Sequence, residues 1–219
     1  MKMVIGICIW AFFGLSPVSS AVGALEVFHL ESDEALLEIL PEENVAFVAE
    51  GRIGDLGGAA MFELDLGQSV GAPAVTDQHD WQSGVTEAFS LTYDKTWNRV
   101  DFTIGETMLQ YTPGQLFMEI FVRAWAEDAG TSISLEDLIL NGESVPATCE
   151  ATGAAGLDIL RIRGGTLLDG FVLTGTATME WSASPPTESG LSFQINAGSP
   201  DTQVATAKVT WGQIKNRFR

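Results

Sequence analysis

Residues 171–181, FVLTGTATMEW, decide the fold class of this chain. Apolar or small side chains take every second position, and Val172, three threonines and Glu180 take the positions between them. This alternation is typical of a strand with one face in a core and the other in water. Residues 191–197, LSFQINA, alternate in the same way, and the turn formers SASPPTESG separate the two runs. The sequence therefore predicts a long β-hairpin at the centre of an antiparallel sandwich.

The rest of the chain repeats this pattern at the regular spacing expected of a β-sandwich or barrel. Runs over 85–93 and 100–104 flank a turn at 94–98 and predict a second hairpin. A strand over 116–126 is expected to point Met118, Ile120, Val122 and Ala124 inward. Further strands are predicted over 45–51, 60–66, 108–112, 133–140, 145–151, 157–163 and 204–214, with a loop over 67–79.

One short helix is expected near the N-terminus. Ser32 precedes Asp33 and Glu34 and the apolar run ALLEIL, so the serine can cap a helix whose first turn carries acids. Pro41 would stop that helix. The predicted fold class is all-β, an antiparallel, jelly-roll-like β-sandwich with one short N-terminal helix.

The first 24 residues have the three parts of a secretory signal peptide. Lys2 precedes the short apolar run 4–15, and the small residues of 16–24 offer cleavage after Ala21 or Ala24. The apolar run is too short to span a membrane. We therefore expect a signal peptide over 1–24 and a single β-sandwich domain over 25–219. The mature chain is expected outside the cell or at its surface, with no membrane insertion after cleavage.

Charge and cysteine content narrow the possible partners. The chain has 29 acidic and 11 basic residues, a formal charge of −18, and loss of Lys2 with the signal would make it −19. Such an acidic surface repels nucleic acid and anionic membranes. Only Cys149 would remain after cleavage, so no disulfide can staple the domain and stability must come from burial.

No catalytic motif stands out, and we expect a non-enzyme. His29 and His79 are the only histidines, and neither a G-x-S-x-G nor an H-E-x-x-H motif is present. Cys149 has no basic neighbour that would lower its pKa, so it reads as structural. Calcium is the candidate cation, because loops of β-sandwiches hold it with clustered oxygens. Asp77, Asp80 and Asp94 are its candidate ligands, and no other cofactor is expected.

Two tryptophans are the candidate ligand-binding residues. Trp97 lies in the predicted turn 94–98, and Trp125 lies opposite the inward residues of the 116–126 strand. Exposed aromatic rings can stack on the faces of sugars. The alternative is that the two rings cover a hydrophobic edge or are packed by the N-terminal helix. The outward threonines of 171–181 form a ladder on one strand only, which is an ordinary strand surface.

Three long strings resemble a known family of secreted bacterial modules. They are WQSGVTEAFSLTYDKTWNRVDFTIGETMLQYT, IFVRAWAEDAGTSISLEDLILNG and GLDILRIRGGTLLDGFVLTGTATMEWSASPPTESGLSFQINAG, which together span about residues 81–198. The chain is similar to the choice-of-anchor type, most nearly the W domain, of PEP-CTERM-associated surface proteins. Members of that family end in sorting or anchoring tails, whereas this chain ends in TWGQIKNRFR. The family implies no activity that can be assigned to residues here.

The first functional hypothesis is a secreted, non-catalytic structural or interaction module. The second is a carbohydrate-binding module that uses Trp97, Trp125 and an acidic loop, with calcium as a stabilising ion. The third is a hydrolase whose site the sequence does not reveal. The expected partner is an extracellular protein or a polysaccharide.

Overall fold

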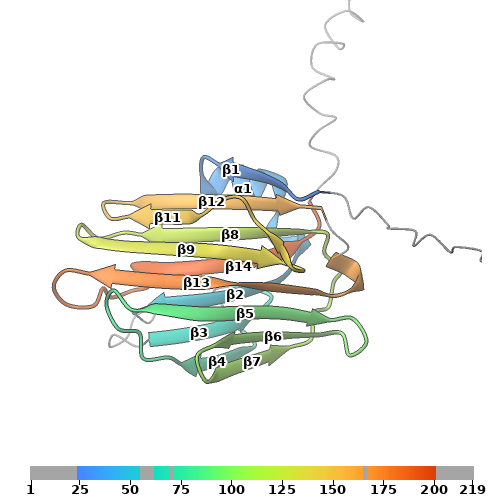
Figure 1. Ribbon diagram of the computed structural model, residues 1–219, viewed down its shortest axis with the longest axis horizontal. Helices are drawn as coiled ribbons and strands as arrows, with labels where there is room; N and C mark the ends of the chain where they lie inside the picture. Colours follow the sequence, from blue (N-terminus) through green and yellow to red (C-terminus); the bar gives the residue numbers. More distant parts are fainter. Residues whose placement is uncertain (1–23, 55–61, 70–71, 165–166, 201–219) are drawn as a thin grey trace, which may run out of the picture.

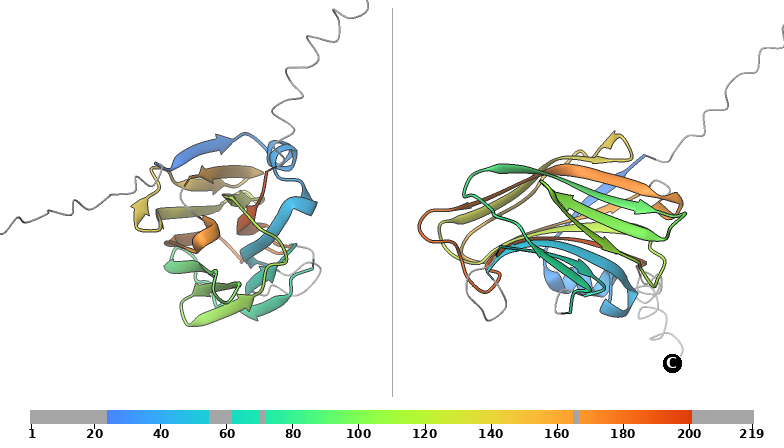
Figure 2. Two further views of the ribbon diagram at one scale, coloured as in Figure 1. Left: turned by 90° about the vertical axis from the view of Figure 1, so that its right-hand side faces the viewer. Right: turned by 90° about the horizontal axis from the view of Figure 1, so that it is seen from below.

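The computed structural model describes residues 24–54, 62–69, 72–164 and 167–200. Its strands form two antiparallel sheets packed face to face, seen as two layers in Figure 2 and as strands running in a common direction in Figure 1. Sheet A has the order β1 (Glu26–Leu30), β12 (Gly156–Arg163), β8 (Glu119–Ala126), β14 (Leu191–Gly198), β2 (Val45–Ile53), β3 (Phe62–Gly67) and β4 (Val75–Gln78). Sheet B has the order β10 (Glu143–Ser144), β9 (Thr131–Leu140), β13 (Phe171–Trp181), β5 (Thr86–Asp94), β6 (Arg99–Ile104) and β7 (Thr107–Tyr111), and β11 (Cys149–Thr152) also pairs with β9. The predicted all-β sandwich is confirmed.

The inward faces of the two sheets share one hydrophobic core. Phe193 of β14 lies within it, and its ring centroid is 6.2 Å from that of Trp81, 5.9 Å from Phe89 and 6.3 Å from Phe102. Gly51 of β2 makes room for this ring, because a Cβ atom there would lie 2.6 Å from Phe193 Cε1. Aromatic packing across the two sheets thus fixes their spacing at this point.

The two runs that predicted a central hairpin lie in different sheets, so that prediction is wrong. β13 pairs with β9 and β5 in sheet B, whereas β14 pairs with β8 and β2 in sheet A. Residues 182–190 carry the chain from one sheet to the other. Nine residues easily bridge two sheets about 10 Å apart. Alternation identifies each strand and its inward face, but it does not name the strand's partners.

The predicted hairpin over 85–104 is confirmed. β5 and β6 pair antiparallel from Phe89 and Ile104 to Asp94 and Arg99. Asp94 Oδ1 accepts hydrogen bonds from the backbone N–H groups of Thr96 and Trp97, at 2.8 and 3.3 Å. This carboxylate therefore stabilises the turn.

Several details of the strand predictions need correction. In β8, Ile120, Val122 and Ala124 are buried in the core as expected, but Met118 is 48% exposed because the strand begins one residue after it. The predicted loop over 67–79 contains β4, and β1 was not predicted. Both are edge strands of sheet A with little burial alternation, so their sequences carry a weak signal. The predicted strand over 145–151 is shorter in the structure, where β11 starts at Cys149.

The predicted helix is confirmed as α1 (Asp33–Ile39), the one α-helix among the described residues. Ser32 caps it, because its Oγ accepts a hydrogen bond from the N–H of Ala35 at 3.2 Å. Short 3₁₀ turns follow at Glu42–Asn44 and later at Leu167–Asp169. The helix lies on the outer side of sheet A (Figure 2). Residues 1–23 of the predicted signal peptide and the predicted strand over 204–214 lie outside the described residues.

Candidate functional site

The outer face of sheet A carries charged and amide side chains in cross-strand rows. The strand register places Asp65 of β3, Glu50 of β2, Gln194 of β14 and Arg123 of β8 side by side in one row. The next row holds Glu63, Arg52, Ser192 and Trp125 on the same four strands. Side chains in such rows are close enough to pair across the sheet.

Several of these polar side chains are buried. Glu50 is 2% exposed, Arg52 5% and Asp65 2%. The Arg52 guanidinium forms ion pairs with Glu63 and with Asp65, the latter at 2.7 Å. Glu50 Oε1 accepts a hydrogen bond from Gln194 Nε2 at 2.9 Å, while Glu50 Oε2 is buried and has no hydrogen-bond partner among the residues that the structure describes.

The buried cluster of Glu50, Arg52, Glu63 and Asp65 has three carboxyl groups and one guanidinium. This excess of acidic groups and their burial affect the pKa of Glu50. Burial raises the pKa of Glu50 to about 7. The hydrogen bond from Gln194 and the positive charge of Arg52 oppose that rise, and the negative charge of Asp65 adds to it. A carboxyl group with this pKa changes charge near neutral pH.

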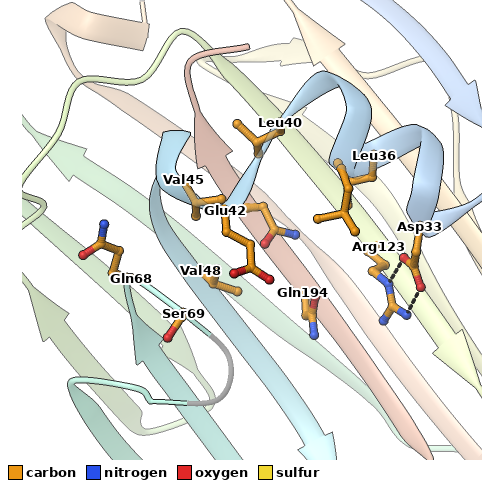
Figure 3. A pocket seen from close by; sticks show the side chains of 12 residues that line it. Asp33, Leu36, Leu40, Glu42, Val45, Val48, Gln68, Ser69, Arg123 and Gln194 are labelled. Atoms are coloured by element: carbon orange, nitrogen blue, oxygen red, sulfur yellow. Dashed lines mark hydrogen bonds and ion pairs between the residues drawn. The ribbon is translucent and has the colours of Figure 1, made fainter. Parts of the chain in front are cut away.

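A pocket of about 570 Å³ lies between α1 and this face, and we call it the α1 pocket. Its volume falls within the range of sites for small ligands. One wall is apolar and comes largely from the helix, and the floor is formed by strands β2, β14 and β8 (Figure 3). The lining residues are Asp33, Leu36, Leu37, Leu40, Glu42, Val45, Val48, Gln68, Ser69, Arg123, Gln194 and Asn196.

One ion pair joins the helix to the floor of the α1 pocket. Arg123 Nε and Nη2 donate to the two carboxylate oxygens of Asp33, at 2.7 and 2.8 Å (Figure 3). This two-point pairing neutralises Arg123 locally and holds α1 against β8. The Glu42 carboxylate also lines the pocket, and it has no ion-pair partner among the residues that the structure describes. The charge left in the pocket is therefore negative.

Asn196 is the one residue of the lining set whose buried side-chain nitrogen lacks a hydrogen-bond acceptor in the described part of the chain. It is 7% exposed and lies between Val48 and Phe121 in the sheet register. Its Nδ2 atom has no partner. Buried amide donors are nearly always paired, and an unpaired one costs free energy. A ligand with an acceptor oxygen or nitrogen in the pocket would recover that cost.

The two tryptophans proposed for sugar binding do not share a surface. Trp97 is 72% exposed on the turn between β5 and β6 of sheet B. Trp125 is half-buried on the outer face of sheet A, where the Arg123 guanidinium lies 5.3 Å from its ring centroid. The sandwich core separates these two places, so they cannot hold one ligand together.

A second, shallower hollow lies close to Trp97 in the sequence. It has a volume of about 330 Å³, and Lys95, Asn141 and Asp169 are among its lining residues. Lys95 Nζ lies 2.6 Å from Asp169 Oδ1 at the surface. This hollow has the mixed polar lining that hydroxyl-rich ligands need.

The structure does not gather the three proposed calcium ligands. Asp94 is used in the turn before Trp97, and Asp77 Oδ1 accepts a hydrogen bond from the N–H of the next residue, Gln78, at 2.8 Å. Asp80 follows β4 near His79. Within the described ranges, no three acidic, histidine or cysteine residues are grouped so that they could hold a metal ion.

Neither histidine stands beside a nucleophile. His29 Nδ1 lies 2.8 Å from Asp158 Oδ1 at an exposed edge. The ring of His79 packs against Trp81 at 4.7 Å between centroids, and burial lowers its pKa. Cys149 is buried, its thiol donates to the carbonyl oxygens of Val122 and Asp158, and burial raises its pKa. A thiol in this state is a packing group rather than a nucleophile.

The α1 pocket and the charged cluster beside it were not predicted from the sequence. Glu50 with Arg52, and Glu63 with Asp65, are charged pairs two positions apart on successive strands, which is a signal for cross-strand ion pairs. No prediction was made of what packs against those positions, because alternation alone does not show it.

The sequence was compared with protein-family models and with curated proteins. No protein-family model matches the chain, and no curated protein matches it. None of the helices in the described ranges is long and apolar enough to cross a membrane.

Proposed function

We propose that this protein is a secreted, non-catalytic interaction module whose binding site is the α1 pocket. The observation that carries the proposal is the buried Nδ2 of Asn196, which lacks a partner among the described residues and belongs to a residue that lines the pocket. An apolar wall with a few oriented polar groups is the usual composition of a small-ligand site. The ligand we expect has an apolar part for Leu36, Leu40 and Val48 and a hydrogen-bond acceptor for Asn196.

The residues of the pocket favour a binding role over a catalytic one, and the sequence favours a secreted protein over one kept inside the cell. No histidine or cysteine lines the α1 pocket, and its one arginine is held by Asp33. The N-terminal sequence has the pattern of a signal peptide, and the strongly acidic composition suits a soluble extracellular protein. The proposed partner is a small molecule, a polysaccharide or an extracellular protein that contains such an apolar group and hydrogen-bond acceptor.

The test is binding of n-octanol, a neutral probe with an alkyl chain and one hydroxyl acceptor. We expect it to raise the thermal midpoint of the full chain, since a ligand of the folded state stabilises that state. The NMR signals of the Leu36, Leu40 and Val48 methyl groups should shift with saturation. Asn196→Ala should weaken binding by about tenfold, the value of one hydrogen bond.

Two leucine variants separate pocket binding from general adsorption. Leu36→Ala should weaken the binding of n-octanol, because Leu36 lines the α1 pocket. Leu116→Ala is the matched control, because Leu116 is 71% exposed and does not line it. Equal effects of the two substitutions, or no saturable binding at all, would contradict the proposal.

A carbohydrate-binding role is the second candidate, and the exposed ring of Trp97 favours it. The ring lies on a turn whose neighbouring residue Lys95 lines the hollow with Asn141 and Asp169. Thermal unfolding with and without calcium, and then against a panel of polysaccharides, tests this role. Trp97→Ala should abolish any shift of the midpoint, and Trp125→Ala should leave it, because the rings lie on different surfaces. A shift that needs Trp125 and not Trp97 would count against this site.

A further inference from the structure

The floor of the α1 pocket is coupled to a buried carboxyl group. Gln194 lines the pocket and donates its Nε2 hydrogen to Glu50 Oε1 at 2.9 Å. Glu50 does not line the pocket; it lies next to Gln194 in the same cross-strand row and is 2% exposed. Its second oxygen, Oε2, has no hydrogen-bond partner within the described ranges. Gln194 is thus the contact between the pocket and the Glu50 carboxyl group.

The protonation state of Glu50 changes which ends of the Gln194 amide can face it. An ionised carboxylate only accepts hydrogen bonds, so it pairs with the Nε2 end and leaves Oε1 of Gln194 for the pocket. A protonated carboxyl keeps an acceptor oxygen for Nε2 and gains an O–H that can donate to Oε1, so the amide can also turn and leave Nε2 for the pocket. The floor therefore offers only an acceptor in the first state, whereas in the second state it can also offer a donor.

The groups around Glu50 allow both states. Arg52 lies two positions away on β2, Asp65 is its cross-strand neighbour on β3, and Glu63 on β3 shares Arg52 with Asp65. On the other side, β14 contributes the uncharged Gln194 and β8 contributes Arg123, which binds Asp33 of α1. Burial and Asp65 favour the protonated form, whereas Gln194 and the two arginines favour the ionised one, so that the pKa lies at about 7.

We infer that Glu50, acting through Gln194, selects the class of ligand in the α1 pocket, and that the ionised state selects a primary ammonium group on an apolar chain. This inference rests on the proposed function of the pocket. The ammonium group donates to Gln194 Oε1 and lies in the negative field of Glu42 and Glu50, while the chain packs on Leu36, Leu40 and Val48. Protonation of Glu50 removes one negative charge and allows the amide to turn its donor end toward the pocket, so the ammonium ligand binds more weakly.

The experiment compares n-octylammonium with n-octanol on the full chain at about pH 5.5 and about pH 8.5, on either side of the Glu50 pKa of about 7. An alkylammonium group stays charged over this range, as lysine does. We expect n-octylammonium to bind about tenfold more tightly at the higher pH, the effect of one charge-assisted hydrogen bond. The affinity of n-octanol, whose hydroxyl can both donate and accept, should change little.

Two glutamine substitutions identify the group responsible. Glu50→Gln keeps an uncharged side chain at every pH, so it should bind n-octylammonium weakly at both pH values. Glu43→Gln is the matched control, because Glu43 is exposed and does not line the pocket, and it should keep the tenfold ratio. The inference is overturned if the ratio in the unsubstituted chain is one, or if Glu50→Gln keeps it. If the unsubstituted chain binds neither probe, the proposed function itself is refuted. If it binds n-octanol but its affinity for n-octylammonium does not depend on pH, only the role of Glu50 is refuted.

Discussion

Replacing Arg52 by methionine should destabilise this protein more than any substitution of a surface ion pair. Arg52 is 5% exposed and is the guanidinium between Glu63 and Asp65. Methionine keeps much of the length and apolar contact of the side chain but removes its charge. The carboxylates of Glu63 and Asp65 then lose the positive charge of Arg52 in a buried region, and Glu50 lies beside Asp65.

The expected cost is about 3–5 kcal/mol in the free energy of unfolding, the usual result of removing one partner of a buried ion pair. For a chain of this size that loss lowers the thermal midpoint on the order of 10 °C. The cost should be largest at about pH 8, where Glu50 is ionised, and should shrink as the pH falls through about 7 and Glu50 takes up a proton.

Urea unfolding at about pH 8 and about pH 5 measures both effects, since the midpoint shift at constant slope gives the change in stability. Lys95→Met is the control, because the Lys95–Asp169 ion pair is exposed on both sides and its loss should have no measurable effect. Adding Glu63→Gln and Asp65→Asn to Arg52→Met should recover most of the loss, because the uncompensated charges are gone. If Arg52→Met costs no more than Lys95→Met at the higher pH, the cluster is not energetically buried and the reasoning is wrong.

Three further predictions follow from single sites. The raised pKa of Glu50 means that the folded state binds its proton more tightly than the unfolded state. This proton binding stabilises the fold fully below the ordinary glutamate pKa of 4.5, and the stabilisation is lost as pH rises through the folded-state pKa of about 7. The loss amounts to about 3 kcal/mol between those values, and urea unfolding of Glu50→Gln should show a flatter pH profile than Glu180→Gln, an exposed control. Gly51→Val should cost about 1–3 kcal/mol by overpacking against Phe193, and a thermal midpoint equal to that of the unsubstituted protein would exclude that contact. Cys149 should resist a thiol reagent in the native protein and react in urea, and fast labelling without denaturant would show that the thiol is not buried as described.

Much of the fold was predictable because strand alternation is a local property of the sequence. The inward set Phe171, Leu173, Ala177 and Met179 of β13 is buried as its period of two required. Capping by Ser32 likewise depends on residues within one helical turn. The edge strands β1 and β4 were not predicted, because their sequences have no continuous apolar face.

The candidate site was not predictable in the same way. Trp97 is exposed, as a turn residue should be, but Trp125 lies under Arg123 on a different surface. The pocket that the structure places between α1 and sheet A joins Leu36 of the helix to Gln194 and Asn196, more than 150 positions later in the chain. No local pattern encodes a contact over that separation.

The sequence by itself determined which residues form strands, which side of most strands faces the core, and where the helix begins. Only the tertiary structure decided that β13 and β14 belong to different sheets and that the side of β2 carrying Glu50 and Arg52 is buried. The physical reason is that alternation records the two sides of a strand but not what packs against each side. A strand face made of polar residues can be buried by elements that are distant in the sequence. Its charged side chains must then pair with one another or take up a proton.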